Sequence, residues 1–420
     1  MDTKDFNTVC SSLQSFVDYV FGSCRGAPLR SNLHHCVEAR LSSAKRKTHQ
    51  PAAMQLVATQ EEADGLRQRM NRATLSDRWS DKEVRQYLYE IAQHNVPDAF
   101  ALIVDDTGII KKGNKSPGVQ RQYCGKAGKR ENCQLVVSTH LAGWKSSQPL
   151  EADLYLPEVW AEDKDRREQA GIPEDVVFQT KPDIALAQID RILQENGADK
   201  TVLADAFYGN NGPFRQGLRE RELTYSLAIR ATTHIWRPDQ GPDPVAEYKG
   251  KGRRSKCQLP GEYHPVSVAD FANELTPSQF QTVRLIRGYQ EPKEVRVAVA
   301  RIRTAHNAYK GKAPGEEEWL IIVWPEGQNA PTDYFLSNLG HEISTKTLLE
   351  TTLLRWRIER DYQDLKQEVG LEHYEGRSWT GFHHHLTICM AAYAFLASQR
   401  KLFPPKASRV DRISEKENCS

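Results

Sequence analysis

Apolar positions along the chain predict a helical first part. In residues 1–98, apolar side chains recur at helical spacing, as in the set Phe6, Val9, Leu13, Phe16, Val17 and Val20. Two capping boxes, Thr59 with Glu62 and Ser80 with Glu83, each predict the start of a further helix. We therefore expect a helical N-terminal domain over residues 1–98.

From residue 99 onward, short apolar runs predict strands that alternate with helices. Strands are expected over 100–104, 132–141, 150–156, 201–204 and 223–229, with helices over 183–196 and 212–222. Three strands followed by helix, strand, helix and strand is the order of an RNase H-like fold of the α/β class, a mixed sheet flanked by helices. In that fold the first and fourth strands are neighbours, so Asp105 and Asp205, which follow them, would emerge side by side.

The core is expected to be interrupted once. Its first part covers 99–230, and a mainly β insertion subdomain covers 231–335, with strands at 282–288, 294–303 and 319–325. Its second part covers 336–400, and 401–420 is a polar tail.

One helix in the second part aligns charged residues. It is predicted to run from Leu353 to Gly370, and one face of it carries Arg355, Glu359, Tyr362, Lys366 and Val369. A solvated face with ion pairs inside the helix would explain this pattern. The two acids at strand ends, Asp105 and Asp205, favour a functional face instead.

Three such carboxylates in a semi-dry cleft repel one another, and they stay ionised if a multivalent cation neutralises them. Carboxylate oxygens suit Mg2+, with Mn2+ as a substitute. Two ions about 3.5–4 Å apart can activate an attacking oxygen and stabilise a leaving oxygen in phosphodiester displacement.

Overall charge says little about partners, since the 420 residues carry a net charge of +2. Eight cysteines without a Cys-x2-Cys pair suit reduced thiols, and Cys24, His34, His35 and Cys36 match no standard zinc spacing. We find no signal peptide, and the longest apolar run, 386–397, is too short to span a bilayer. A cytoplasmic protein is expected.

Local basic clusters are candidate nucleic-acid contacts. The run Arg40, Lys45, Arg46 and Lys47 is either a solvated loop or a phosphate contact, and the two readings are evenly matched. If it is the latter, the N-terminal domain binds DNA. Arg253 and Arg254, in a basic loop of the insertion, form either a linker or a DNA-gripping element, and we favour the second. Lys112 is a further candidate for DNA contact.

Several ordered blocks resemble DDE transposases of the IS-four-like superfamily. Arg355-x3-Glu359-x6-Lys366 is similar to its Tyr-x2-Arg-x3-Glu-x6-Lys signature, with Thr352 in place of the Tyr. The blocks Asp105-Asp106-Thr107-Gly108 and Asp205-Ala206-Phe207-Tyr208-Gly209 are similar to those of the IS-seven-zero-one branch, as is the C-terminal block from Leu371 to Trp379 with His383-His384-His385. The resemblance covers residues 99–398.

The resemblance implies a cut-and-paste DNA transposase with the catalytic, metal-binding triad Asp105, Asp205 and Glu359. Asp105 and Asp106 compete for the first position, because adjacent strand residues point to opposite faces and at most one of them can face the metal site. The pattern of the branch favours Asp105, and the Asp-Thr pairing of more distant relatives would favour Asp106. Arg355 and Lys366 would hold phosphates of the transposon end, unless they pair with Glu359.

The implied partners are double-stranded DNA, both as terminal inverted repeats and as target, and a second copy of the chain in a homodimer on DNA. The implied location is the bacterial nucleoid. A nuclease or domesticated copy that cuts without integrating, and a non-catalytic DNA-binding regulator, are the alternatives.

Other conspicuous side chains are given structural or minor roles. His383–His385 are expected to lie at the surface or to contact the DNA backbone rather than to bind a metal ion, because consecutive helical residues cannot all face one ion. Trp236 and Trp324 are expected to pack in the insertion, with base stacking as the alternative. Tyr123 and Trp379 are assigned to packing.

Overall fold

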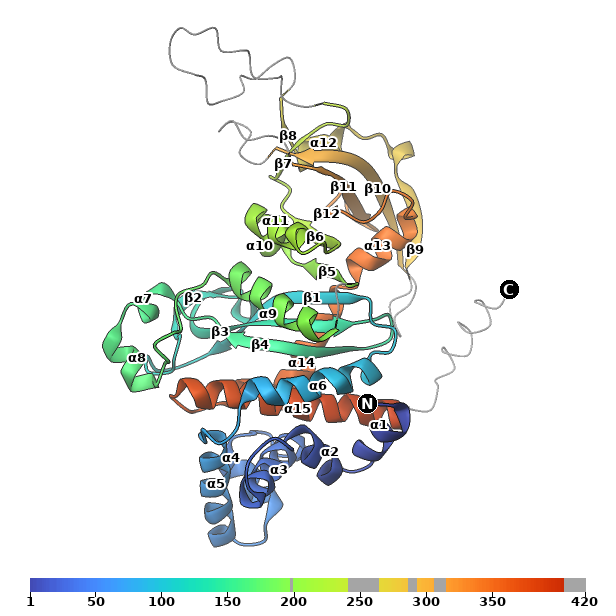
Figure 1. Cartoon of the computed structure of the whole chain (residues 1–420). Coiled ribbons are helices and arrows are strands. Elements are labelled where there is room, and N and C mark those ends of the chain that lie inside the picture. The colour runs from blue at the N-terminus through green and yellow to red at the C-terminus, as the bar shows by residue number, and fades with distance from the viewer. Residues whose placement is uncertain (197–198, 241–263, 286–292, 306–314, 404–420) are drawn as a thin grey trace. The chain divides into compact units, whose positions relative to one another are not determined.

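The chain forms two compact units, each built from a sheet with helices. The computed structural model describes residues 1–196, 199–240, 264–285, 293–305 and 315–403 (Figure 1). One unit comprises Met1–Gly197 and Trp356–Ser420, here called unit 1, and unit 2 comprises Ala198–Arg355. The α/β class is confirmed. The predicted domain boundaries divide the chain differently and stay predictions.

The sheet of unit 1 is antiparallel and centred on one long strand, β3. Strand β3 pairs with the other three strands, and its pairing with β4 is irregular at Thr139–His140. The four strands are β1 (Ala101–Ile110), β2 (Gln120–Cys124), β3 (Lys129–Ala142) and β4 (Ser147–Leu154). They confirm the predicted first three strands and add β2, a short and mostly polar strand that a search for apolar runs does not detect.

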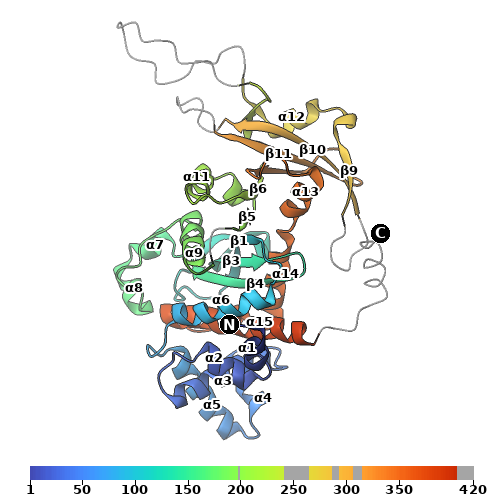
Figure 2. The same ribbon diagram turned by 45° about the vertical axis from the view of Figure 1, so that its right-hand side comes forward.

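Two helices cover the two faces of this sheet. Helix α9 (Lys181–Asn196) packs against β3 and β4, and α14 (Trp356–Gln367) packs against β1 and β4. Figure 2 shows α9 and α14 on opposite sides of β1 and β3. The long helix α15 (Trp379–Leu402) packs on β4 beside α6, and it follows α14 through the short turn η4 (Leu371–His373).

The N-terminal helices belong to the same compact unit as this sheet. Helices α2, α3, α5 and α6 all contact α15; α6 lies beside α15 on β4, and α15 separates the other three from the sheet (Figure 1). Thr59 and Ser80 cap α5 and α6 as predicted. The six helices are α1 (Thr3–Val9), α2 (Leu13–Val20), α3 (Ala27–Leu41), α4 (His49–Leu56), α5 (Gln60–Thr74) and α6 (Asp81–Asn95). Two short helices, α7 (Glu158–Ala161) and α8 (Lys164–Ala170), follow β4.

Unit 2 contains a sheet in which β5 and β6 run parallel and the remaining pairs are antiparallel. The order is β5-β6-β12-β11-β10, with β9 and β7 both on β10 and β8 on β7. The strands are β5 (Thr201–Ala204), β6 (Tyr225–Ile229), β7 (His234–Trp236), β8 (Val266–Ser267), β9 (Gln281–Leu285), β10 (Lys293–Thr304), β11 (Glu317–Pro325) and β12 (Asp333–Ser337).

Apolar clusters lie on both faces of the unit 2 sheet. One cluster includes Phe271 of α12 (Val268–Glu274), and the other includes Leu348 of α13 (Thr345–Leu353). Helices α10 (Ala206–Gly209) and α11 (Gly212–Glu220) connect β5 to β6. The strands of the predicted insertion thus extend the sheet that contains β5, β6 and β12.

Among the described helices, not one combines the length and the apolarity that a membrane crossing requires.

Candidate functional site

The first candidate acids lie inside a strand rather than at its end. Strand β1 continues to Ile110, so Asp105 and Asp106 occupy its middle, and the prediction that they follow the strand is wrong. The strand continues because β3 supplies partners as far as Cys133. Gly108 permits the close approach of β2, since a Cβ there would lie 2.4 Å from Cys124 Sγ.

Asp105 lies on the sheet face that α14 covers. It is paired in register with Ser138, and directly paired residues project from the same face. Ser138 Oγ lies 2.8 Å from the hydroxyl of Tyr362 on α14. Tyr362 is three residues after Glu359, which places the two on one side of the helix. The face of β1 that carries Asp105 therefore meets the side of α14 that carries Glu359.

The electrostatics of Tyr362 are consistent with this arrangement. Burial, and next the negative charge of Asp105, raise the pKa of Tyr362 well above its ordinary value. The tyrosine therefore stays protonated at neutral pH and keeps a hydroxyl hydrogen to donate.

A buried chain of hydrogen bonds holds α14 on the sheet. His140 Nε2 lies 3.0 Å from Ser138 Oγ, and His140 Nδ1 lies 2.8 Å from Asp361 Oδ2. Ser147 and Tyr393 both donate to Asp361 Oδ1, at 2.8 and 2.7 Å. Asp361 is 2% exposed, so these partners offset the cost of burying its carboxylate. The sequence reading missed this network, because its members come from three separate segments.

Asp106 projects from the opposite face, where it forms an ion pair. Its Oδ1 lies 2.7 Å from Lys181 Nζ, at the start of α9. The adjacent acids, between which the sequence left a choice, thus lie on different faces. Only Asp105 shares a face with α14.

Asp205 directly follows β5 in unit 2, as predicted, and it caps a helix. Its Oδ1 accepts hydrogen bonds from the backbone N–H groups of Phe207 and Tyr208, at 2.9 and 3.3 Å. Its Oδ2 makes no hydrogen bond with the described residues, which leaves a carboxylate oxygen for a ligand. Gly209 ends α10 against β6, since a Cβ there would lie 1.9 Å from Ala228 O. Helix capping alone would also explain an Asp at this position.

The helix predicted from Leu353 to Gly370 is interrupted. Helix α13 ends at Leu353, a turn covers Leu354 and Arg355, and α14 begins at Trp356. The hydroxyl of Thr352 donates to Leu348 O at 2.7 Å, and such bonds to the preceding turn bend helices. Arg355 therefore does not belong to the helix that carries Glu359.

The other residues predicted to contact DNA differ in their exposure and in their ion-pair partners. Lys366 Nζ pairs with Glu372 at 3.3 Å, and burial lowers the pKa of Lys366. Lys112 is exposed. Arg253 and Arg254 lie outside the described residues.

Two further predictions need correction. His383, His384 and His385 are buried rather than at the surface, because α15 lies between β4 and the N-terminal helices; His384 stacks on Trp79 with ring centroids 3.7 Å apart. Tyr123 was assigned to packing, but it lies on the short strand β2 and is 64% exposed.

The basic run is not simply a solvated loop either. Arg40 and Lys47 are buried, whereas Arg46 is exposed and pairs with Glu375. Arg40 is buried because its guanidinium bonds to His385 and Lys47.

The tryptophans of the insertion pack as expected. Trp236 is 3% exposed, and Trp324 stacks under Arg296. Trp379 packs beside Trp160.

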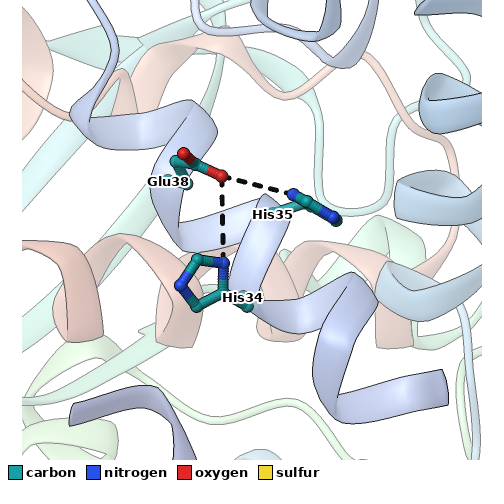
Figure 3. Close-up of side chains that lie close together, drawn as sticks. All are labelled: His34, His35 and Glu38. Atoms are coloured by element: carbon teal, nitrogen blue, oxygen red, sulfur yellow. Dashed lines mark hydrogen bonds and ion pairs between the residues drawn. The ribbon is translucent and has the colours of Figure 1, made fainter. Parts of the chain in front are cut away.

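A separate group of possible metal ligands lies on α3. Figure 3 shows Glu38 between the rings of His34 and His35, with Nδ1–Oε2 distances of 3.8 and 3.2 Å. All three side chains come from one helical turn, at spacings of three and four residues that bring ion-pair partners together on any helix. The helix geometry alone explains this group. Mg2+ prefers oxygen ligands, so its two imidazoles do not suit that ion.

A family comparison places the chain in a class of nucleases. Residues 22–292 match the family model described as DDE superfamily endonuclease, and the chain belongs to this family. Nucleases of this superfamily use divalent metal ions.

A curated relative adds a more particular likeness. The chain is 35% identical over 135 residues to a probable transposase for insertion sequence element IS701 from Microchaete diplosiphon. The match covers 32% of this chain and 33% of the relative, so the chain spans about one third of the length of that protein.

Proposed function

We propose that this chain is a DNA transposase that cuts the ends of its element and joins the freed 3′ hydroxyl to target DNA. The observation that carries the proposal is the position of Asp105, on the face of β1 that meets the Glu359 side of α14. Family membership and the resemblance to an insertion-sequence transposase support it. The proposed core is RNase H-like, and it acts on double-stranded DNA, both transposon ends and target, as a homodimer.

The proposed site consists of Asp105, Asp205 and Glu359. Its donor set fits Mg2+, because all three side chains offer hard carboxylate oxygens. The uninvolved Oδ2 of Asp205 supports a ligand role. Two Mg2+ ions at such a site would activate the attacking oxygen and stabilise the leaving oxygen.

The surrounding residues would orient these carboxylates. Tyr362 and Ser138 would fix the spacing between α14 and the sheet, and the buried pair formed by His140 and the adjacent Asp361 anchors the same turn of the helix. Arg355 would contact phosphates of the transposon end. Lys366 could do so only by exchanging its partner Glu372 for a phosphate.

The decisive experiment uses a labelled duplex of the element's end with Mg2+ and a target plasmid. Nicked and joined product is the expected result. Nicking without joining would favour the nuclease alternative, and a shifted but uncut duplex would favour the regulator.

Substituting Asp205→Asn tests the site itself. Asn caps helices about as well as Asp, so α10 should be retained while the charge is lost. We expect cleavage to fall by about 1000-fold or more with duplex binding retained, because a metal ligand contributes several kcal/mol. Asp163→Asn is the matched control, since Asp163 caps α8 in the same way. An active Asp205→Asn variant would contradict the site.

A further inference from the structure

An arginine-lined pocket in unit 1 lies outside the candidate catalytic site. Its volume is about 500 Å3, and its lining includes Arg40, Arg67, Arg377, His49, His373 and Glu375. The residues come from the N-terminal helices and from the segment just before α15. This volume is within the range of small-molecule sites, which is about 300–1,000 Å3.

Arg40 is a built-in part of this pocket. Its side chain is 3% exposed, and it bonds His385 Nδ1 at 3.1 Å and Lys47 O. Its buried Nε–H has no hydrogen-bond partner among the described residues. An unmatched buried donor on a cation costs free energy, and an anionic ligand would supply the missing acceptor.

Two more arginines are available to a ligand. Neither Arg67 on α5 nor Arg377 forms an ion pair or hydrogen bond with another described residue. The one acidic residue named in the lining, Glu375, pairs with Arg46. The lining therefore contains three guanidinium groups and one carboxylate, and that carboxylate is already paired with Arg46.

Backbone N–H groups add to the positive potential, and two histidines in the lining have lowered pKa values. The pocket contains the N-terminus of α4, where the cap residue Thr48 makes no side-chain capping bond. The free N–H groups of such a terminus favour anions. Burial first, and then Arg40 and Arg67, lower the pKa of His49 to about 3. His373 Nδ1 accepts from Lys47 N at 2.9 Å, so its Nε2 carries the proton.

We propose that this pocket is a phosphate-binding site that holds a nucleotide phosphate of DNA. A phosphate offers several acceptor oxygens, which suits the guanidinium forks of Arg67 and Arg377, the Nε–H of Arg40 and the backbone N–H groups at the start of α4. DNA as the source rests on the proposed function; the phosphate chemistry does not. The site would anchor the duplex on the N-terminal helices, away from the carboxylates.

The test measures binding, not cleavage. Arg67→Gln and Arg377→Gln are introduced into the full chain, and affinity for a random-sequence DNA duplex is measured without divalent metal over a range of salt concentrations. Neither side chain has a partner among the described residues, so the fold should be retained, which thermal unfolding can verify. Arg69→Gln is the matched control, because Arg69 lies exposed on the same helix and does not line the pocket.

Each pocket variant should bind the duplex about tenfold more weakly at low salt. Each should also reduce the slope of log K against log salt by about 1, as expected for one lost phosphate contact. Arg69→Gln should stay within about twofold of the unmodified chain, since a solvated surface charge contributes little.

Unchanged affinity and slope in both pocket variants would overturn the proposal. Titrations with inorganic phosphate and with dAMP separate the sources: if these bind through Arg67 and Arg377 while duplex affinity is unchanged, DNA is not the source and the proposal fails as stated. Because no cleavage is measured, a chain that binds in this way but never cuts would count against the proposed function alone.

Discussion

On the α9 face of the unit 1 sheet, buried acids are matched by arginines. Glu151 Oε2 lies 2.8 Å from Arg85 and 2.7 Å from Arg191, and Asp153 contacts the same two guanidinium groups. On the α14 face, the hydrogen bonds of Asp361 come instead from the imidazole of His140 and the hydroxyls of Ser147 and Tyr393.

Carboxylates have different partners on the two faces of the sheet, with different consequences for cation binding. Arginine partners cancel the negative charge and leave no demand for a cation. Hydroxyl donors satisfy carboxylate oxygens without supplying a positive charge. Burial, and after it the negative charges of Asp105 and Asp361, raise the pKa of Tyr362 on the α14 face. This is the face on which we propose a divalent cation, beside Asp105.

Replacing the two adjacent acids one at a time gives the strictest test of this difference between the two faces. Asp105→Asn should lower Mg2+-dependent cleavage by about 1000-fold, because it removes a proposed metal ligand. Asp106→Asn should retain activity within about tenfold and cost about 1–2 kcal/mol of stability through its lost, partly buried pair with Lys181. Cleavage rates and urea unfolding measure both. An inactive Asp106→Asn with an active Asp105→Asn would reverse the assignment of faces.

Removing the hydroxyl of Tyr362, on the α14 face, should have a smaller effect on cleavage. Tyr362→Phe removes its bond to Ser138, and we expect the Mg2+ concentration for half-maximal cleavage to rise about tenfold, as for other groups that orient metal ligands. Tyr89→Phe is the matched control, because Tyr89 donates to Glu151 on the α9 face. That variant should lose stability with an unchanged Mg2+ requirement. A Tyr362→Phe enzyme with a normal Mg2+ requirement would show that the hydroxyl only packs.

The local features of this fold could be predicted from the sequence. Apolar runs predicted the first part of β1 and the strand before Asp205, and capping boxes predicted α5 and α6, because these features depend on neighbouring residues. The extent of β1 beyond Asp106 could not be predicted, since it depends on pairing with residues of β3 that lie 23 to 29 positions away in the chain, from Ile110 with Cys133 to Thr107 with Val136.

The choice between Asp105 and Asp106 also depends on tertiary structure. Alternation along a strand predicts that the two face opposite sides, but not which side receives α14. Likewise, nothing in the sequence around Thr352 marks a break in the helix. The break follows from a hydroxyl that bonds to Leu348 O and also contacts Ser226 at 2.6 Å.

The smallest expected effect is on the stability of the fold. It comes from Asp153 on the α9 face and depends on pH. Burial would raise the pKa of Asp153, but Arg191 and Arg85 outweigh it and hold the pKa well below its ordinary value of 3.8. A carboxyl with a lowered pKa in the folded state stabilises the fold above its ordinary pKa. That stabilisation is lost as the pH falls further, because the unfolded chain takes up the proton first.

A double-mutant cycle can isolate this contribution. With Asp153→Asn and Arg191→Gln, we expect a coupling free energy of about 1 kcal/mol at pH 7, reduced by solvent screening because Asp153 is 24% and Arg191 35% exposed. Urea unfolding between pH 7 and pH 3 should show the coupling constant down to about pH 4 and shrinking below it. A coupling that already shrinks well above pH 4 would mean that Asp153 takes up its proton in the folded chain at an ordinary or raised pKa, and the two faces would then not differ in the way their charges are matched.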